Sequence, residues 1–208
     1  MRSEELGVKE VNCLIAGVGG QGTVLAARVL GAAAMAAGFD VRGSETIGMA
    51  QRGGSVTSHV RMGRDIASPL ISFGRADVVL ALEPGEALRA VDFLKPGEAL
   101  RAVDFLKPGG TFIVCDRPII PSVKGDYDGA VAAAWLSEYT NAFVVRGEDI
   151  IKNCGARSLN IALIGAAAAR GAFPFGLNEI EAALAERLDA KYLNINITAL
   201  RYGANVGA

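Results

Sequence analysis

The residues best suited to ligand chemistry stand in a glycine-rich stretch that follows a short apolar run. Residues 11–23 read VNCLIAGVGGQGT, and GVGGQG fits the pattern G-x-G-x-x-G. Glycine permits a tight turn and lets backbone N–H groups approach a ligand closely. The positive end of a following helix favours an anion such as a phosphate, a pyrophosphate or a carboxylate. The residues assigned to this predicted cofactor site are Gly17, Gly19, Gly20, Gln21 and Gly22.

The glycine turn has three interpretations that the sequence leaves open. An NAD or FAD site needs an acidic residue that closes the second strand, about 20 residues further on. Asp40 opens that strand instead, and Glu45 follows it inside another motif. The turn is therefore a dinucleotide site, a site for another phosphate or anion, or a structural turn that lets the helix pack closely on the sheet.

A second candidate site lies in residues 44–55, SETIGMAQRGGS, which are polar and lack periodicity. Such a stretch is typical of a functional loop. Arginine is a bidentate donor to anions, and glutamate accepts hydrogen bonds from a cofactor or substrate. We therefore predict catalytic roles for Glu45 and Arg52 and a cofactor contact for Ser55. The alternative is a Glu45–Arg52 pair that fixes the loop, or contacts across a subunit interface.

The other polar side chains offer less chemistry. His59 is the only histidine, and a lone histidine on a strand is more often structural than catalytic. The three cysteines, Cys13, Cys115 and Cys154, lie far apart and form no C-x-x-C pair. A metal site built by this chain alone is not expected. Asn160 and Asn196 interrupt apolar helices and need partners, so we expect them to hold loops near the site or to bind a neighbouring helix.

Composition narrows the function class. The chain has 208 residues, enough for one domain with a sizeable core. Its 21 basic and 22 acidic residues give a net charge of −1, and no basic stripe is present, so neither nucleic acid nor a membrane is an expected partner. Residues 1–10 are predicted to be a frayed leader without the apolar core of a signal peptide. A cytoplasmic location fits these features. The mean hydropathy of +0.32 suggests apolar surface buried against a partner.

The order of predicted elements indicates the fold. Strands are predicted at 11–16, 39–42, 55–62, 77–83, 111–115 and 143–145, with a short antiparallel return at 69–72. Helices are predicted at 20–37, 130–139, 158–169, 178–188 and 190–202. Asn178 and Glu181 are predicted to form a capping box. Strands that alternate with helices favour an α/β fold, here a Rossmann-like, largely parallel sheet flanked by helices, with an antiparallel hairpin excursion.

Several motifs together resemble a known family. GVGGQG after a strand is followed by SETIGMAQRGGSVTSHVRMG and then by DVVLALEPGEALRA. This series is similar to the gamma-type domain of 2-oxoacid:ferredoxin oxidoreductases, in particular to the small subunits of the indolepyruvate type. The similarity continues in SLNIALIGAAAARG (158–171) and LNINITALRYG (193–203). It therefore covers residues 11–208, which we expect to form a single domain.

The resemblance implies an activity shared with other chains. Such enzymes decarboxylate a 2-oxo acid, here indolepyruvate or another aryl pyruvate, to an acyl-CoA and pass electrons to ferredoxin. In the indolepyruvate type, thiamine diphosphate and the iron–sulfur clusters belong to a large alpha subunit, which is the expected partner. Coenzyme A is the ligand that the resemblance suggests for the glycine turn. The alternatives are a gamma subunit acting on pyruvate, 2-oxoglutarate or branched-chain 2-oxo acids, a free-standing NAD- or FAD-binding protein, and a nucleotide-binding regulator.

A tandem duplication interrupts the family pattern. Residues 84–95 read PGEALRAVDFLK, and residues 96–107 repeat the same letters. Each copy begins with a proline, which suits the first position of a helix but breaks a helix interior at a cost of about 3 kcal/mol or more. A continuous helix would also rotate the second copy by about 120° relative to the first. We therefore expect two short helices or a kink at Pro96, with one copy partly exposed.

Deletion of one copy tests this interpretation. The shortened chain reads LALEPGEALRAVDFLKPGGTF across the junction. It should fold at least as stably as the full chain, because the apolar side chains of the deleted copy no longer have to be buried. Thermal melts of the two proteins measure the difference. A fall of many degrees after the deletion would mean that both copies are packed into the core.

Overall fold

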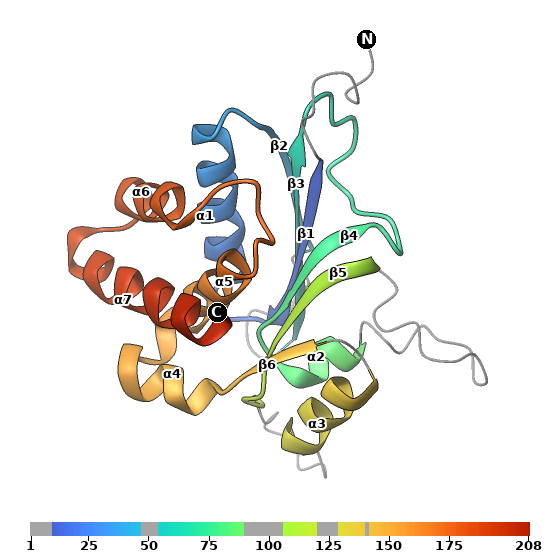
Figure 1. The fold of residues 1–208 in the computed structure, drawn as a ribbon, viewed down its shortest axis with the longest axis vertical. Helices are drawn as coiled ribbons and strands as arrows, with labels where there is room; N and C mark the ends of the chain where they lie inside the picture. Colours follow the sequence, from blue (N-terminus) through green and yellow to red (C-terminus); the bar gives the residue numbers. More distant parts are fainter. Residues whose placement is uncertain (1–9, 47–53, 90–105, 120–128, 140–141) are drawn as a thin grey trace.

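The centre of the molecule is a six-stranded sheet with the order β2-β3-β1-β4-β5-β6 (Figure 1). The computed structural model describes residues 10–46, 54–89, 106–119, 129–139 and 142–208. The strands are β1 (Val11–Val18), β2 (Asp40–Thr46), β3 (Ser55–Gly63), β4 (Ala76–Ala81), β5 (Leu106–Cys115) and β6 (Ala142–Val145). Strands β1, β4, β5 and β6 pair in parallel, whereas β3 runs antiparallel to both β1 and β2. The predicted α/β fold, with a largely parallel sheet and an antiparallel excursion, is confirmed.

Strand β3 separates β1 from β2, and this insertion corrects two local predictions. Residues 44–46 belong to β2 rather than to a loop, because the outer edge of β3 gives them a ladder partner; Glu45 pairs with Ser58. Residues 69–72 are irregular instead of forming a return strand. Both edges of β3 are already occupied by β1 and β2, so no edge is left for them. Side chains hold this segment instead: the Ile71 N–H donates to His59 Nδ1 at 3.2 Å.

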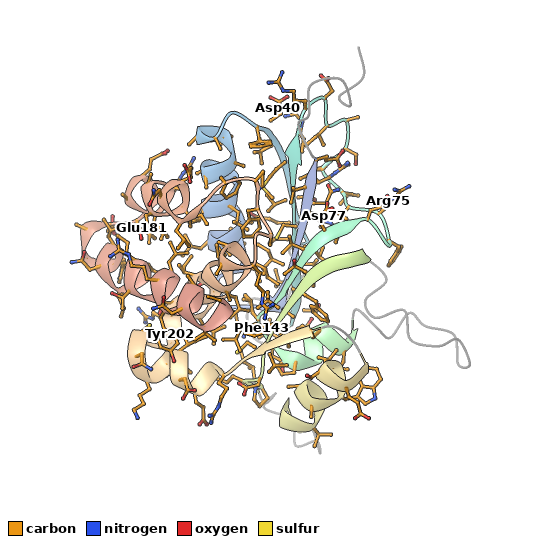
Figure 2. The ribbon with its side chains drawn as sticks, in the orientation of Figure 1. Asp40, Arg75, Asp77, Phe143, Glu181 and Tyr202 are labelled. Carbon is orange, nitrogen blue, oxygen red and sulfur yellow. The ribbon has the colours of Figure 1, made fainter. Side chains whose placement is uncertain are left out.

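Helices cover both faces of the sheet. One face carries α1 (Thr23–Ala36), α4 (Gly147–Cys154), α5 (Leu159–Ala169), α6 (Leu177–Arg187) and α7 (Ala190–Gly207). The other carries α2 (Pro84–Arg89) and α3 (Gly129–Tyr139) (Figure 1). Side chains of β1 alternate between the two layers, with Ile15 in the first cluster and Leu14 in the second. Figure 2 shows side chains filling the space between the sheet and the first group of helices.

Helix boundaries follow the predicted signals in part. Gly38 has φ +86° and its N–H donates to the Met35 carbonyl, so it ends α1 as predicted. Helix α2 begins at Pro84 as predicted, while Pro96 lies outside the described residues. Helix α4 was not predicted. The capping box predicted at Asn178 and Glu181 is wrong by two positions: the Glu179 carboxylate accepts from the Gly176 N–H at 2.9 Å.

Backbone contact between α5 and α7 explains why α7 continues past its predicted end at Tyr202. A Cβ atom on Gly203 would lie 1.8 Å from the Ala162 carbonyl oxygen, and one on Gly165 would lie 2.0 Å from the Leu200 carbonyl oxygen. Gly203 is therefore a site of close approach inside the helix, not a helix stop. Since the contact is between main chains, only glycine fits these positions. Within the described residues, no helix has the length and apolarity that a membrane crossing needs.

Alanine substitution tests the α5–α7 contact with a matched control. Gly203→Ala should lower the free energy of unfolding by about 1–3 kcal/mol or more, because the helices must move apart. Gly31→Ala in α1 places its Cβ 3.5 Å from Val41 Cγ1, an ordinary contact. That control should be neutral, or more stable by up to about 1 kcal/mol, because alanine is the better helix former. Urea unfolding midpoints of the purified variants compare the two, and equal midpoints would contradict the close contact.

Candidate functional site

The glycine turn is braced by its own glutamine. Gln21 Oε1 accepts from the Val18 N–H at 2.8 Å, and Gln21 Nε2 donates to the Leu82 carbonyl at 2.8 Å. The side-chain amide thus joins the carboxyl ends of β1 and β4, where the backbone ladder ends. Gly17 belongs to the same arrangement, because a Cβ there would lie 2.8 Å from Gln21 Oε1. The structure therefore gives both residues a role in shaping the turn.

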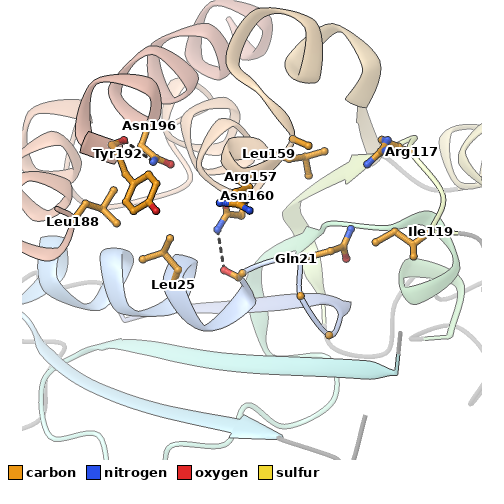
Figure 3. Close-up of a pocket in the computed structure, with 14 residues that line it drawn as sticks. Gln21, Leu25, Arg117, Ile119, Arg157, Leu159, Asn160, Leu188, Tyr192 and Asn196 are labelled. Atoms are coloured by element: carbon orange, nitrogen blue, oxygen red, sulfur yellow. Dashed lines mark hydrogen bonds between the residues drawn. The ribbon is translucent and has the colours of Figure 1, made fainter. Parts of the chain in front are cut away.

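A second amide ties the turn to α5. Gly22 has φ +78° at the start of α1, and Asn160 Nδ2 donates to its carbonyl at 2.9 Å (Figure 3). A Cβ on Gly22 would lie 2.7 Å from this Nδ2 atom. Asn160 Oδ1 accepts from the Ile161 N–H at 2.9 Å, within the first turn of α5. The amino ends of α1 and α5 are consequently held side by side, and the predicted role of Asn160 in holding a loop near the site is confirmed.

A cavity of about 570 Å³ opens at this junction. Its cationic end is lined by the glycine turn with Arg117, which follows β5, and Arg157, which lies in the 3₁₀ turn (Ala156–Ser158) before α5. The opposite end is lined by Leu25, Leu188, Tyr192 and Asn196 from α1, the α6–α7 connection and α7 (Figure 3). The cavity lies beyond the carboxyl ends of the parallel strands, where α/β sheets generally bind ligands.

The cationic end favours an anion. The amino ends of α1 and α5 both face it, and each carries partial positive charge. The N–H groups of Gly20 and Gly22 donate to no acceptor in the described part of the chain. The guanidinium groups of Arg117 and Arg157 likewise have no hydrogen-bond or ion-pair partner there. Of the described residues that line the cavity, none carries a carboxylate.

Among the described residues of the second motif, none lines this cavity, and only backbone groups connect the motif to the glycine turn. Ser55 is exposed and pairs with Val18, and the Gly54 carbonyl accepts from the Gly19 N–H at 2.8 Å. Glu45 instead lines a separate cavity of about 470 Å³ between β2 and α1. Arg52 lies outside the described residues. The catalytic roles of Glu45 and Arg52 and the cofactor contact of Ser55 stay predictions.

The position of β2 argues against a dinucleotide site. The acid that binds a ribose in such sites closes the strand next to β1. Here β3 takes that place, so the end of β2 lies two strand spacings, about 9–10 Å, from β1. Asp40 stands at the far end of β2, where it pairs with Gly63. The turn is therefore better suited to a phosphate-bearing ligand held by arginine than to a dinucleotide held by a carboxylate.

Histidine and cysteine side chains are placed as structural groups. Burial lowers the pKa of His59, and its Nδ1 is occupied by the Ile71 N–H. Burial raises the pKa of the Cys115 thiol to about 12, and it also raises the pKa values of the Cys13 and Cys154 thiols. These thiols are therefore protonated and poor nucleophiles at neutral pH. Within the described ranges, no group of His, Cys, Asp and Glu side chains is arranged to hold a metal ion.

Three cavity-lining or capping residues were missed by the sequence analysis. Arg117 and Arg157 lie outside the strands and helices that the sequence predicts, and a signal for Arg117 was available because it follows a predicted buried strand. Glu83 is 3% exposed and its Oε2 accepts from the Glu86 N–H at 2.8 Å, so it caps α2. The sequence E-P-G-E carries that signal, with an acid before the helix-starting proline.

Exchange of Gln21 for glutamate tests the bracing of the turn. A glutamate carboxylate still accepts from the Val18 N–H but cannot donate to the Leu82 carbonyl. Gln21→Glu should therefore lower the free energy of unfolding by about 1–3 kcal/mol at pH 7. The penalty should shrink as pH falls below about 4.3, where a carboxyl group regains a proton to donate. Asn178→Asp, at an exposed position in the first turn of α6, is the control and should change stability little. Equal unfolding midpoints for the two variants would show that the amide is dispensable.

Comparison with known proteins shows the family. The model of the pyruvate ferredoxin/flavodoxin oxidoreductase family matches residues 12–206. The chain is 35% identical to an indolepyruvate oxidoreductase subunit IorB of Archaeoglobus fulgidus over 94% of both chains. It is 31% identical to the IorB subunit of Thermococcus kodakarensis over 94% of this chain and 95% of the relative.

Solved structures show the same fold. A keto/oxoacid ferredoxin oxidoreductase gamma subunit from Geobacter sulfurreducens superposes with a TM-score of 0.66 at 21% identity, covering 95% of this chain and 98% of that one. A 2-oxoglutarate:ferredoxin oxidoreductase of Magnetococcus marinus also gives a TM-score of 0.66, at 21% identity, but this fold covers 31% of its chain and 96% of the present one. With a family model over nearly its whole length and relatives above 30% identity, the chain belongs to the pyruvate ferredoxin/flavodoxin oxidoreductase family.

Proposed function

We propose that this chain is the small subunit of an indolepyruvate-type 2-oxoacid:ferredoxin oxidoreductase. The observation that carries the proposal is the 35% identity to an indolepyruvate oxidoreductase subunit over 94% of both chains. In the reaction the 2-oxo acid loses its carboxylate as CO₂, its acyl group forms a thioester with coenzyme A, and the released electron pair passes to ferredoxin. The substrate is indolepyruvate or a related aryl pyruvate.

We assign thiamine diphosphate and the iron–sulfur clusters to a large partner subunit. A cluster needs several thiolates around one centre, whereas the three cysteines of this chain are buried separately and have raised pKa values. The residues of the cavity also do not fit the Mg²⁺ that accompanies a diphosphate cofactor, because no carboxylate is among the described lining residues. The complex passes electrons to ferredoxin and works in the cytoplasm, where free thiols persist.

The contribution of this chain is a binding site for coenzyme A at the glycine turn. Coenzyme A carries a pyrophosphate and a further phosphate, which need cationic and N–H donors. Arg117, Arg157 and the N–H groups of Gly20 and Gly22 supply them at one end of the cavity. Arginine suits this task because its planar fork donates two hydrogen bonds to one phosphate. When bound, the cofactor supplies the thiol that accepts the acyl group; the residues of this chain bind and orient it.

Reconstitution with the partner tests the function. The chain alone should not reduce a dye with indolepyruvate and coenzyme A, whereas the complex of both subunits should do so when thiamine diphosphate is added. Turnover by the isolated chain would contradict the subunit assignment.

Substitution of one of the two cavity arginines tests the ligand. Within the complex, Arg157→Ala should raise the KM for coenzyme A about tenfold, the loss of one charge-assisted hydrogen bond, and leave the KM for indolepyruvate unchanged. Arg64→Ala is the matched control, because Arg64 is exposed and follows β3 at the opposite end of the sheet. An unchanged KM for coenzyme A in Arg157→Ala would place its phosphates elsewhere.

A further inference from the structure

The end of the cavity remote from the glycine turn contains a buried acceptor without a donor. Asn196 is 6% exposed and lines the cavity from α7. Its Oδ1 atom has no hydrogen-bond partner in the described structure. A buried amide oxygen left without a donor is unfavourable, so this atom requires a donor group that the described protein does not supply. Figure 3 shows the amide facing the cavity beside Tyr192.

The orientation of the Asn196 amide is fixed by the helix that carries it. Asn196 Nδ2 donates to the Tyr192 carbonyl at 2.8 Å, one turn earlier in α7. Rotation of the amide by half a turn would place Oδ1 against that carbonyl, and two acceptors would then face each other. The cavity is therefore offered a hydrogen-bond acceptor at this point, and a ligand must present an N–H or O–H group to it.

Apolar side chains surround this acceptor. Leu25 projects from α1, and Leu188 and Tyr192 come from the start of α7 and its connection to α6 (Figure 3). Tyr192 is 42% exposed, and Lys191 Nζ lies over its ring at 4.8 Å from the centroid. Aliphatic and aromatic side chains of this kind pack against the faces of a planar ring.

The two ends of the cavity together define a ligand class. One end offers cations and free N–H groups, and the other offers an apolar slot with one inward acceptor. An adenine nucleotide has the matching parts in the same order: a diphosphate, a ribose, and a flat base with an exocyclic amino group. Guanine presents a carbonyl oxygen where adenine presents its amino group, so an acceptor at that point selects adenine.

We propose that Asn196 is the specificity-determining residue of this cavity and that its Oδ1 accepts a hydrogen bond from the amino group of an adenine nucleotide diphosphate. The proposal rests on the proposed function only in that coenzyme A is the expected source of this nucleotide. Leu25, Leu188 and Tyr192 hold the base, while Arg117, Arg157 and the glycine turn hold the diphosphate. Asn196 acts on affinity and not on the chemical step.

Nucleotide binding to the full chain measures this selectivity. By isothermal titration calorimetry, wild-type protein should bind ADP about tenfold more tightly than GDP or inosine diphosphate, which both carry a carbonyl oxygen at the position of the adenine amino group. In Asn196→Ala the ratio should fall to near one. Asn194→Ala, at an exposed position on the same helix, should keep the wild-type ratio. Pyrophosphate should bind both variants as it binds wild type, because its site lies at the other end of the cavity.

Each outcome decides a different question. Equal affinities of wild type for ADP and GDP, or an unchanged ratio in Asn196→Ala, would overturn the adenine assignment while leaving the phosphate site of the proposed function intact. If folded wild-type protein, verified by a thermal melt, binds neither pyrophosphate nor ADP, the adenine assignment and the phosphate site of the proposed function are both overturned. Competition of coenzyme A, NAD⁺ and FAD with ADP then shows which of these compounds supplies the adenine nucleotide. Coenzyme A should compete with ADP most strongly, and a preference for NAD⁺ or FAD would keep Asn196 as the adenine acceptor and refute the coenzyme A proposal.

Discussion

The backbone groups at the carboxyl end of β1 must find partners where the strand leaves the sheet, and the structure around the cavity depends on how this is done. All residues of β1 are buried, so an unpaired N–H or carbonyl there would be costly. Gln21 satisfies the Val18 N–H and the Leu82 carbonyl with one amide. Because both atoms of that amide are used, the turn keeps one shape, and the N–H groups of Gly20 and Gly22 are left without an acceptor in the described part of the chain.

The same turn gathers elements that are distant in sequence. Asn160 ties α5 to the glycine turn, so the amino ends of two helices point at one space. Arg117 reaches it from the end of β5, and Arg157 from the turn before α5. Positive potential is thereby concentrated without a buried ion pair, since neither guanidinium is bonded in the described part of the chain. A multiply charged ligand can replace water there at little cost in reorganisation.

Sequence reasoning succeeded where the signals are local and failed where they depend on packing. Apolar runs, glycines and the helix-starting Pro84 specify strands, turns and helix starts within a few residues. The bracing role of Gln21 needs Leu82, 61 residues away, and the convergence of Arg117 with Arg157 needs the whole sheet. Gly203 shows why such packing contacts could not be predicted. A glycine that ends a helix and a glycine that lets two helices touch look the same in a sequence.

The contact between α5 and α7 also determines which wall of the cavity can adapt. Where main chain touches main chain, no side chain is available to rotate and absorb a change in spacing. This contact lies at residues 200–207 and fixes α7 against α5, and the first turns of the same helix, with Tyr192 and Asn196, form one wall of the cavity. The segment that leaves β5 is held by other contacts: the Gly147 N–H donates to Asp116 Oδ1 at 2.7 Å, and a Cβ atom on Gly129 would lie 2.5 Å from Pro118 Cβ. A change in the size of a bound molecule would therefore have to be met by rotation of side chains on the wall formed by α7, because α7 itself cannot move closer to α5.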